Sequence, residues 1–440
     1  MAVIVAALGY FVDIYDLVLF SVLRVDSLKS LGLTGEELTH MGVDLLNDQM
    51  WGMLVGGVLW GILGDRRGRI SVLFGSITLY SIANILNGFV ADVPAQSSWH
   101  GMMSSLGLDT AVGQYAACRF LAGLGLAGEL GAGITLVSEL LGKQVRGYGT
   151  TIVASFGICG ALLAVLIAKS TDWRISYFIG GGMGLLLLGL RIGVVESGIF
   201  KKVHAAGVQL GNPLMLLWPP RRLLRYAAVV IMALPIWFIV AVPVAFSPEI
   251  GKALGIVDPV TGVALVNAGT AVAWCYGGLA IGDLSSGLLS QWLRSRKKAL
   301  ALYQAMTAAS FVGAYFAIRA SPTPETYYLW SGIMGVGIGY WAVFVTVGAE
   351  QFGTNLRATA ATSAPNFVRG SVPLVTTAWI WLKGTGETAA GGTGVADASA
   401  GLGPVAAAAW VGLVTMVVAA IALACLKETY GTDLEFTEEV

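Results

Sequence analysis

Twelve long apolar stretches, separated by shorter polar ones, dominate this chain of 440 residues. A hydrocarbon core about 30 Å thick requires about 20 apolar residues of helix, and the stretches match that length. The pattern therefore predicts an all-α membrane protein with transmembrane helices over residues 3–23, 45–63, 70–92, 110–140, 148–168, 175–194, 225–247, 263–289, 298–319, 326–350, 358–383 and 402–426.

One longer polar stretch divides these helices into two sets of six. It covers residues 196–224 and contains several lysines and arginines, which is typical of a cytoplasmic linker. We therefore expect an N-terminal six-helix bundle over residues 1–195 and a C-terminal six-helix bundle over residues 225–440.

The composition supports a membrane protein and excludes several other classes. Hydrophobic residues make up 56% of the chain and charged residues only 12%, too few to cover a soluble globule of this size. The net charge of zero argues against a nucleic-acid partner. Four cysteines lie in apolar runs and three histidines are scattered, so we expect neither a metal nor a cofactor.

The positive charges predict an orientation. With both termini cytoplasmic, 17 of the 26 lysines and arginines fall in inside segments, 7 fall in outside loops and 2 lie within spans. This bias follows the positive-inside rule. We expect a multi-pass protein of the inner (plasma) membrane that functions as a monomer, with lipid, protons and a small solute as its partners.

Three short patterns recur between the two halves. The pattern Glu-x-x-Gly-x-x-x-Arg of residues 139–146 recurs at 350–357, the glycine pair of 123–125 recurs at 335–337, and the Gly-Asp pair of 64–65 recurs at 282–283. Parallel repeats of six spans are typical of transporters whose two bundles rock around a site at the bilayer midplane.

Residues 61–73, between the second and third spans, resemble a family signature. They fit G-x-L-x-D-R-x-G-R-x-x-x-L of the major facilitator superfamily at every fixed position. Residues 119–125 and 138–147 resemble the fourth helix and following turn of its sugar-porter and metabolite:proton symporter branches, and residues 196–200 are similar to E-S-P-x-F with glycine for proline.

The resemblance implies a transporter of twelve helices and favours a carboxylate-bearing solute. Metabolite:proton symporters carry organic acids and zwitterionic osmolytes. The seventh span lacks the glutamine pair typical of sugar porters, which argues against a sugar. The motif G-x-G-x-x-G at residues 123–128 lies inside an apolar span without a preceding strand, so we interpret it as helix packing. We expect no enzymatic activity.

A charged residue within a span costs free energy because it lies in the bilayer interior, so such residues are candidates for function. Asp16 lies about 10 Å below the outer edge of the membrane, and Arg119 lies about 13 Å below it. We hypothesise that Asp16 accepts the coupling proton and that Arg119 is its counter-ion; a static ion pair is the alternative. Asp13 lies on the same face as Asp16 and either shares this role or contacts substrate. Glu129 is either a second proton site or a structural hydrogen-bonding group.

Arg369 is the candidate for substrate binding. It lies near the middle of the eleventh span, between Pro365 and Pro373, which bend a helix and free carbonyl groups. A planar, permanently charged guanidinium is suited to bind a carboxylate. An internal salt bridge is the alternative. Further candidates around it are Asn366, Tyr340 and Trp341.

Seven further charged residues are predicted at the cytoplasmic ends of helices, where they would form a gate latch that parts on inward opening. They are Asp65, Arg69, Glu139, Arg146, Asp283, Glu350 and Arg357. Simple solvation at the interface is the alternative.

Together these features predict a proton-coupled symporter that imports a small organic anion by alternating access. A proton-coupled antiporter that exports a drug or metabolite is the second hypothesis. A membrane sensor with the same fold and no transport activity is the third.

Overall fold

The computed structural model describes residues 2–129, 146–190, 216, 218–384, 401–432 and 438. Within these ranges the regular structure is helical, apart from one isolated β-bridge between Val257 and Ala264. Every predicted span overlaps at least one helix of the described residues, and eight helices there are long and apolar enough to cross a membrane.

The helices of the first half follow the predicted spans in order. They are α1 (Ala2–Ser30), α2 (Gly35–Arg67), α3 (Arg69–Asn87), the short α4 (His100–Ser105), α5 (Ala111–Leu126), α7 (Arg146–Ile158), α8 (Gly160–Ser170) and α9 (Trp173–Leu190). The fifth span is divided between α7 and α8.

Helices of the second half are interrupted more often. They are α12 (Pro220–Ile231), α13 (Leu234–Ile239), the π-helix η1 (Val240–Val244), α14 (Ser247–Ala253), α15 (Ala268–Trp292), α16 (Arg296–Ala320), α17 (Pro324–Gly337), α18 (Trp341–Glu350), α19 (Thr354–Arg369), α20 (Val372–Lys383) and α21 (Gly403–Cys425). The seventh, tenth and eleventh spans are therefore broken near their middles, which leaves backbone groups available to side chains or ligands.

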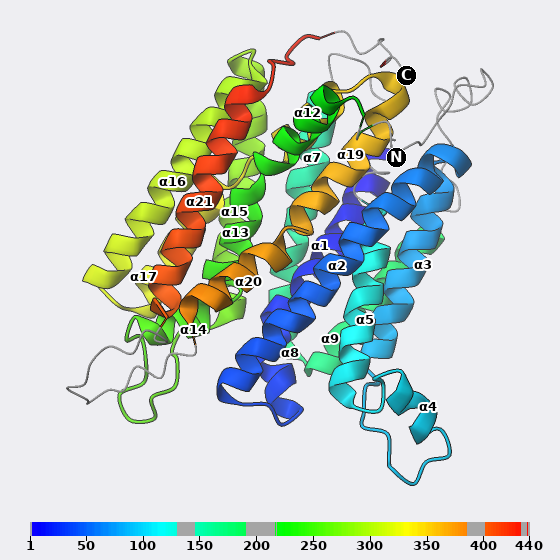
Figure 1. Ribbon diagram of the computed structural model, residues 1–440, viewed down its shortest axis with the longest axis vertical. Coiled ribbons are helices and arrows are strands. Elements are labelled where there is room, and N and C mark those ends of the chain that lie inside the picture. Colours follow the sequence, from blue (N-terminus) through cyan, green and yellow to red (C-terminus); the bar gives the residue numbers. More distant parts are fainter. Residues whose placement is uncertain are drawn as a thin grey trace.

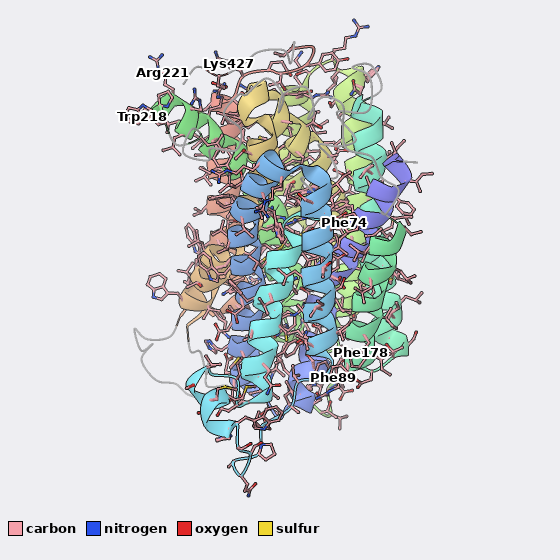
Figure 2. The ribbon with its side chains drawn as sticks, turned by 90° about the vertical axis from the view of Figure 1, so that its right-hand side faces the viewer. Phe74, Phe89, Phe178, Trp218, Arg221 and Lys427 are labelled. Carbon is pink, nitrogen blue, oxygen red and sulfur yellow. The ribbon has the colours of Figure 1, made fainter. Side chains whose placement is uncertain are left out.

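The helices run side by side along the long axis of the molecule (Figure 1). Helix α1 begins and α21 ends at the same end of the bundle, which we call the terminal face; α4 and α14 lie at the opposite face (Figure 1). Arg221 and Lys427 lie at the terminal face, whereas Phe89 and Phe178 lie toward the opposite one (Figure 2). The two halves meet where α15 packs on α7 and α8 and where α19 packs on α2.

The basic turn of the family signature is tight because of one glycine. Helix α2 ends at Arg67 and α3 begins at Arg69, so Gly68 alone reverses the chain. Its φ angle of 94° lies in a region that other L residues rarely adopt. The side chains of Asp65 and Arg69 are outside the described part of the chain.

The same close helix crossing occurs in both halves. A Cβ atom on Gly52, Gly56 or Gly123 would collide with backbone of the partner helix in the pair α2 and α5. In the second half, the corresponding residues in the pair α15 and α17 are Gly278, Gly282 and Gly335. Bare glycine at these positions lets the helices touch through their backbones.

This equivalence corrects one of the predicted repeats. Gly123 and Gly335 correspond, as the sequence predicted, but Gly282 corresponds to Gly56 rather than to Gly64. Asp283 therefore corresponds to Gly57, not to Asp65. The two Gly-Asp pairs match by coincidence, because Gly282 is fixed by the helix crossing and not by a loop.

Two adjacent glycines of α15 test this packing. The backbone oxygen of Gly332 blocks a Cβ atom on Gly278, whereas Gly277 has nothing within 4 Å of that position. We expect Gly278→Ala to destabilise the protein by about 1–3 kcal/mol through overpacking. Gly277→Ala should leave the melting temperature of the purified protein unchanged or slightly raised. Equal melting temperatures for the two variants would contradict the crossing.

Candidate functional site

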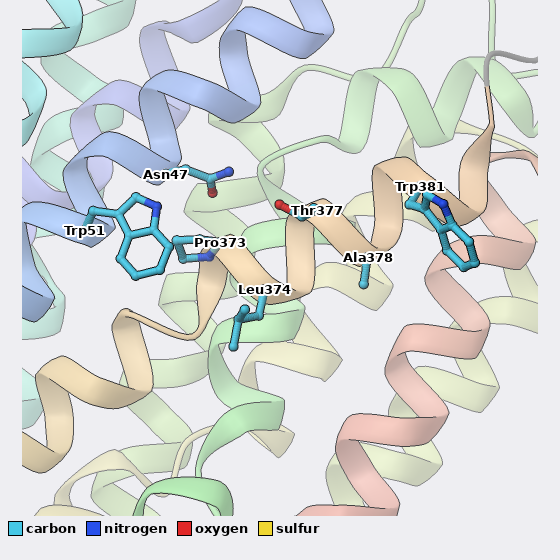
Figure 3. A pocket seen from close by; sticks show the side chains of 7 residues that line it. All are labelled: Asn47, Trp51, Pro373, Leu374, Thr377, Ala378 and Trp381. Atoms are coloured by element: carbon cyan, nitrogen blue, oxygen red, sulfur yellow. The ribbon is translucent and has the colours of Figure 1, made fainter.

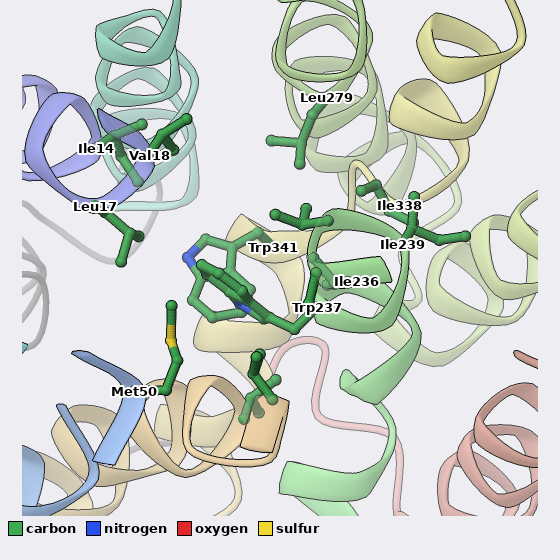
Figure 4. Packing of buried hydrophobic residues seen from close by; sticks show 14 of the residues in the cluster. Ile14, Leu17, Val18, Met50, Ile236, Trp237, Ile239, Leu279, Ile338 and Trp341 are labelled. Carbon is green, nitrogen blue, oxygen red and sulfur yellow. The ribbon is translucent and has the colours of Figure 1, made fainter. Parts of the chain in front are cut away.

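Two buried tryptophans lie in the middle of the molecule, between the two halves. Trp237 of α13 and Trp341 of α18 pack edge to face, with ring centroids 6.4 Å apart. Figure 4 shows them facing Ile14 and Leu17 of α1 and Met50 of α2. We call the region around the two rings the central site. It is built from both halves of the chain.

Arg369 brings a permanent positive charge to the central site. Its side chain is 1% exposed, and its guanidinium carbon lies 5.3 Å from the Trp341 ring centroid and 5.7 Å from that of Trp237. Its Nη1 makes only a long contact of 3.5 Å with Oδ1 of Asn366. Nε of Arg369 and Nε1 of Trp237 donate to no described residue. The central site thus presents buried donors that an anion can satisfy.

The other predicted members of the substrate site are divided. Trp341 is part of the central site. Asn366 uses its Nδ2 for a hydrogen bond of 2.9 Å to the Ala127 carbonyl of the first half, so its amide joins the halves. Tyr340 is buried, but its hydroxyl donates to the Met232 carbonyl at 3.3 Å within the second half, as a packing contact.

Two tyrosines near the central site were not predicted from the sequence. Tyr10 of α1 lies within electrostatic range of Asp13, Asp283 and Arg369. Tyr276 of α15 lies within range of Tyr10 and Arg369. Tyr10 precedes Asp13 by three residues, and this helical spacing was the signal that could have identified it. Nothing in the spacing of Tyr276 or Trp237 pointed to the site.

A second polar cluster lies inside the first half, where Asp16 and Arg119 are both fully buried. Nη2 of Arg119 donates to Oδ1 of Asn84 at 2.6 Å, and its guanidinium carbon lies 4.7 Å from the Tyr177 ring centroid. When the Asn87 amide is oriented with its oxygen toward Arg119, that oxygen accepts from Nε and Nη2 at 3.2 Å each.

The expected direct pair between Asp16 and Arg119 is absent from this conformation of the described residues. Neither oxygen of Asp16 accepts a hydrogen bond of normal geometry from a described residue, although the Asn84 side chain interacts with the carboxylate and Arg119 lies within electrostatic range of it. Oδ1 of Asp16 instead lies against Gly180 of α9. In this conformation Arg119 donates to the amide oxygen of Asn84, whereas the sequence predicted the Asp16 carboxylate as its partner.

Asp13 and Glu129 are both buried in the first half. Asp13 belongs with the central site, because it lies within electrostatic range of Tyr10. Glu129 is the last described residue of the fourth span, and its role stays a prediction.

The structure removes Asp283 from the predicted latch. It lies nine residues before the end of α15, about 14 Å along the helix, and is fully buried. Its Oδ1 accepts a hydrogen bond of 2.7 Å from the backbone N–H of Ala342 in α18. The prediction was wrong because α15 continues well past the aspartate.

Glu350 does lie at the terminal face, where Arg296 contacts it at 3.3 Å and Thr429 donates to it at 2.7 Å. Glu428 accepts hydrogen bonds from the Ser295 hydroxyl and from the backbone N–H groups of Arg296 and Lys297. Burial alone would raise the pKa of Glu428, but the donors, led by the Ser295 hydroxyl, outweigh burial and lower the pKa to about 2. The latch candidates Glu139 and the side chains of Arg146 and Arg357 lie outside the described residues.

Two ion pairs join the halves at the opposite face. Arg24 of α1 is 1% exposed and contacts both carboxylate oxygens of Glu249 in α14, at 2.7 and 2.9 Å. Nζ of Lys383 in α20 lies 2.7 Å from Glu36 of α2.

Aromatic rings connect these two ion pairs. The guanidinium carbon of Arg24 lies 4.2 Å from the Phe246 ring centroid, Phe246 packs on Trp379 at 5.1 Å, and Nζ of Lys383 lies 5.9 Å from the Trp379 ring. Cations of both halves thus share one aromatic seam that holds the opposite face together.

A groove between α2 and α20 is a weaker candidate for the solute site. It has a volume of about 420 Å³ and is lined by Asn47, Trp51, Pro373, Leu374, Thr377, Ala378 and Trp381 (Figure 3). Its lining carries no charge, and Trp381 and Leu374 are largely exposed. Such a surface is suited to lipid rather than to a polar solute.

We expect Glu249→Gln to loosen the opposite face. Leaving a buried charge unpaired costs about 3–5 kcal/mol, and less here because Glu249 is partly exposed. Spin labels at positions 29 and 252, in a protein without its native cysteines, should report longer and broader distances in the variant. Glu325→Gln, an exposed carboxylate at the start of α17, is the control. Unchanged distances in both variants would exclude the ion pair as a clamp.

Curated relatives are similar over most of the chain. A putative niacin/nicotinamide transporter of Bacillus subtilis is 26% identical over 376 residues, which cover 83% of this chain and 84% of the relative. The niacin transporter of Acinetobacter baylyi is 25% identical over 389 residues and covers 81% of each chain.

A solved structure has a similar fold. The proton:xylose symporter bound to 6-bromo-6-deoxy-D-glucose superposes with a TM-score of 0.68 over 99% of this chain and 97% of the symporter, at 17% identity. This likeness shows the fold of twelve helices in two bundles. Because the model of the Major Facilitator Superfamily matches residues 6–377, this chain belongs to that superfamily of membrane transporters.

Proposed function

We propose that this transporter is a proton-coupled symporter that imports a small organic anion, with both termini in the cytoplasm. The observation that carries the proposal is the environment of Arg369. Its guanidinium is buried beside two tryptophans, and its Nε donates to no described residue. A permanent charge in the membrane interior requires a compensating partner. A carboxylate substrate is the partner that fits its planar donors.

The shape of the central site favours a ring-bearing substrate. Trp237 and Trp341 offer aromatic surface on the same side as the guanidinium. Aromatic surfaces of this kind bind flat rings in addition to supplying hydrophobic area. One relative is named as a putative niacin/nicotinamide transporter and the other as a niacin transporter. Both names contain niacin, a ring compound with one carboxylate, which supports the same class.

The cluster of Asp16, Asn84 and Arg119 supports proton coupling. A charged carboxylate buried without donors is costly, and a bound proton removes that cost. Movement of the bundles exchanges the partners of Arg119 between the Asn84 amide and the Asp16 carboxylate. The proton then leaves Asp16 when Arg119 pairs with it, so proton release follows the change of conformation.

Arg369→Lys tests the anion site. A lysine keeps the charge but loses the planar pair of donors, so the apparent affinity for monocarboxylates should fall at least tenfold. The measurement is uptake of a radiolabelled monocarboxylate into liposomes that contain the purified protein, with unlabelled monocarboxylates, betaines and sugars as competitors. Arg221→Lys, on an exposed residue of the terminal face, is the control. Unchanged affinity in Arg369→Lys would remove this residue from the site.

Asp16→Asn tests the coupling. An amide cannot exchange a proton, so the variant should lose accumulation of the solute under an inward proton gradient yet retain exchange of labelled for unlabelled solute. Asp44→Asn, at an exposed position of α2, should accumulate solute normally. Accumulation by Asp16→Asn would refute this residue as the proton site. Expulsion of solute by the native protein under the same gradient would identify an exporter.

A further inference from the structure

One stripe of α15 faces the central site from the second half. Tyr276, Leu279 and Asp283 are three and four residues apart, so their side chains lie on one side of the helix. Leu279 points toward the tryptophan pair in Figure 4. Tyr276 lies within electrostatic range of Tyr10 and Arg369. Asp283 therefore continues a helix face that already lines the site.

The Asp283 carboxylate is fixed in place by backbone donors at the start of α18, Ala342 and Trp341. Its Oδ1 accepts from the backbone of Ala342, the second residue of α18, directly after the break in the tenth span. Its Oδ2 is buried and accepts from no described residue. A carboxylate with this arrangement has one oxygen available, and that oxygen is held rigidly by the helix that also carries Trp341.

The charges around Tyr10 limit what can bind. Both Asp283 and Arg369 lie within electrostatic range of its hydroxyl. An anion on Arg369 adds a second negative charge to a buried region that already holds the Asp283 carboxylate, and like charges repel each other in a medium of low dielectric constant. A substrate with a positive group away from its carboxylate removes this repulsion and gives Oδ2 a partner.

From this geometry we propose that Asp283 is a specificity-determining residue, which binds a cationic group on the substrate while Arg369 binds the carboxylate. The inference rests on the proposed function, because it places the substrate carboxylate on Arg369. It predicts that the transporter prefers ring carboxylates with an ammonium-type substituent to plain ring carboxylates of the same shape.

Two probes of nearly equal shape test the proposal. 3-(Aminomethyl)benzoate carries an ammonium group where 3-ethylbenzoate carries a methyl group. Dissociation constants are measured by tryptophan fluorescence of the purified full-length protein. The native protein should bind the ammonium probe at least tenfold more tightly than the ethyl probe. In Asp283→Asn this ratio should fall at least tenfold, because the ammonium probe loses its partner and the ethyl probe loses a repulsion.

The variant is chosen to preserve the fold. An asparagine keeps an oxygen for the Ala342 N–H, and Asp283→Ser provides a second side chain that can accept this hydrogen bond. Retained binding of 3-ethylbenzoate by either variant demonstrates a folded central site. Asp44→Asn, an exposed carboxylate of α2, should leave the ratio of the two affinities unchanged.

Three results would overturn the inference. Unchanged affinities for both probes in Asp283→Asn would reduce Asp283 to a cap of α18. Equal gains in affinity for both probes would make it a resident counter-ion of Arg369. If neither probe binds the native protein, the proposed function fails together with the inference; a preference for 3-ethylbenzoate that depends on Arg369 would refute the inference alone.

Discussion

The cost of a permanently charged guanidinium inside a membrane is the constraint on which this structure depends. Among the arginines whose side chains the structure describes, three are no more than 1% exposed, namely Arg24, Arg119 and Arg369. Each lies over an aromatic ring, but their polar partners differ in strength. Arg24 has both oxygens of a carboxylate, Arg119 has neutral amides, and Arg369 has one long contact with an amide.

This order of compensation fits the three tasks that we propose for these arginines. A full ion pair is strong and connects helices of both halves, so Arg24 is suited to hold the opposite face together. Amides satisfy hydrogen bonds without neutralising charge, which leaves Arg119 able to exchange its partner for the nearby Asp16 carboxylate. Arg369 has the weakest compensation, which makes it the cation most able to attract an anion from solution.

Near-identical helix crossings surround this asymmetric chemistry. The glycine contacts of α2 with α5 recur in α15 with α17, which gives both halves the same rigid frame. At one equivalent position the halves differ: Gly57 makes room for Asn366, whereas Asp283 places a carboxylate beside the break before α18. The two halves therefore share the helix crossings and differ in the polar side chains at equivalent positions. Broken helices in the second half supply the remaining polar groups.

The sequence by itself determined the membrane class, the helical spans and the family. A run of about 20 apolar residues is stable in lipid as a helix, because a helix forms all of its backbone hydrogen bonds within its own segment. It also predicted Arg369 and Trp341 as neighbours, and the structure places them together, 5.3 Å from guanidinium carbon to ring centroid.

Only the tertiary structure decided which of these residues meet. It placed Asn84 on Arg119, moved Asp283 from the predicted latch into the membrane interior, and joined Arg24 to Glu249, 225 residues apart in the chain. Such contacts depend on the rotation and depth of each helix, which are fixed by close packing against its neighbours and leave no periodic trace in the sequence.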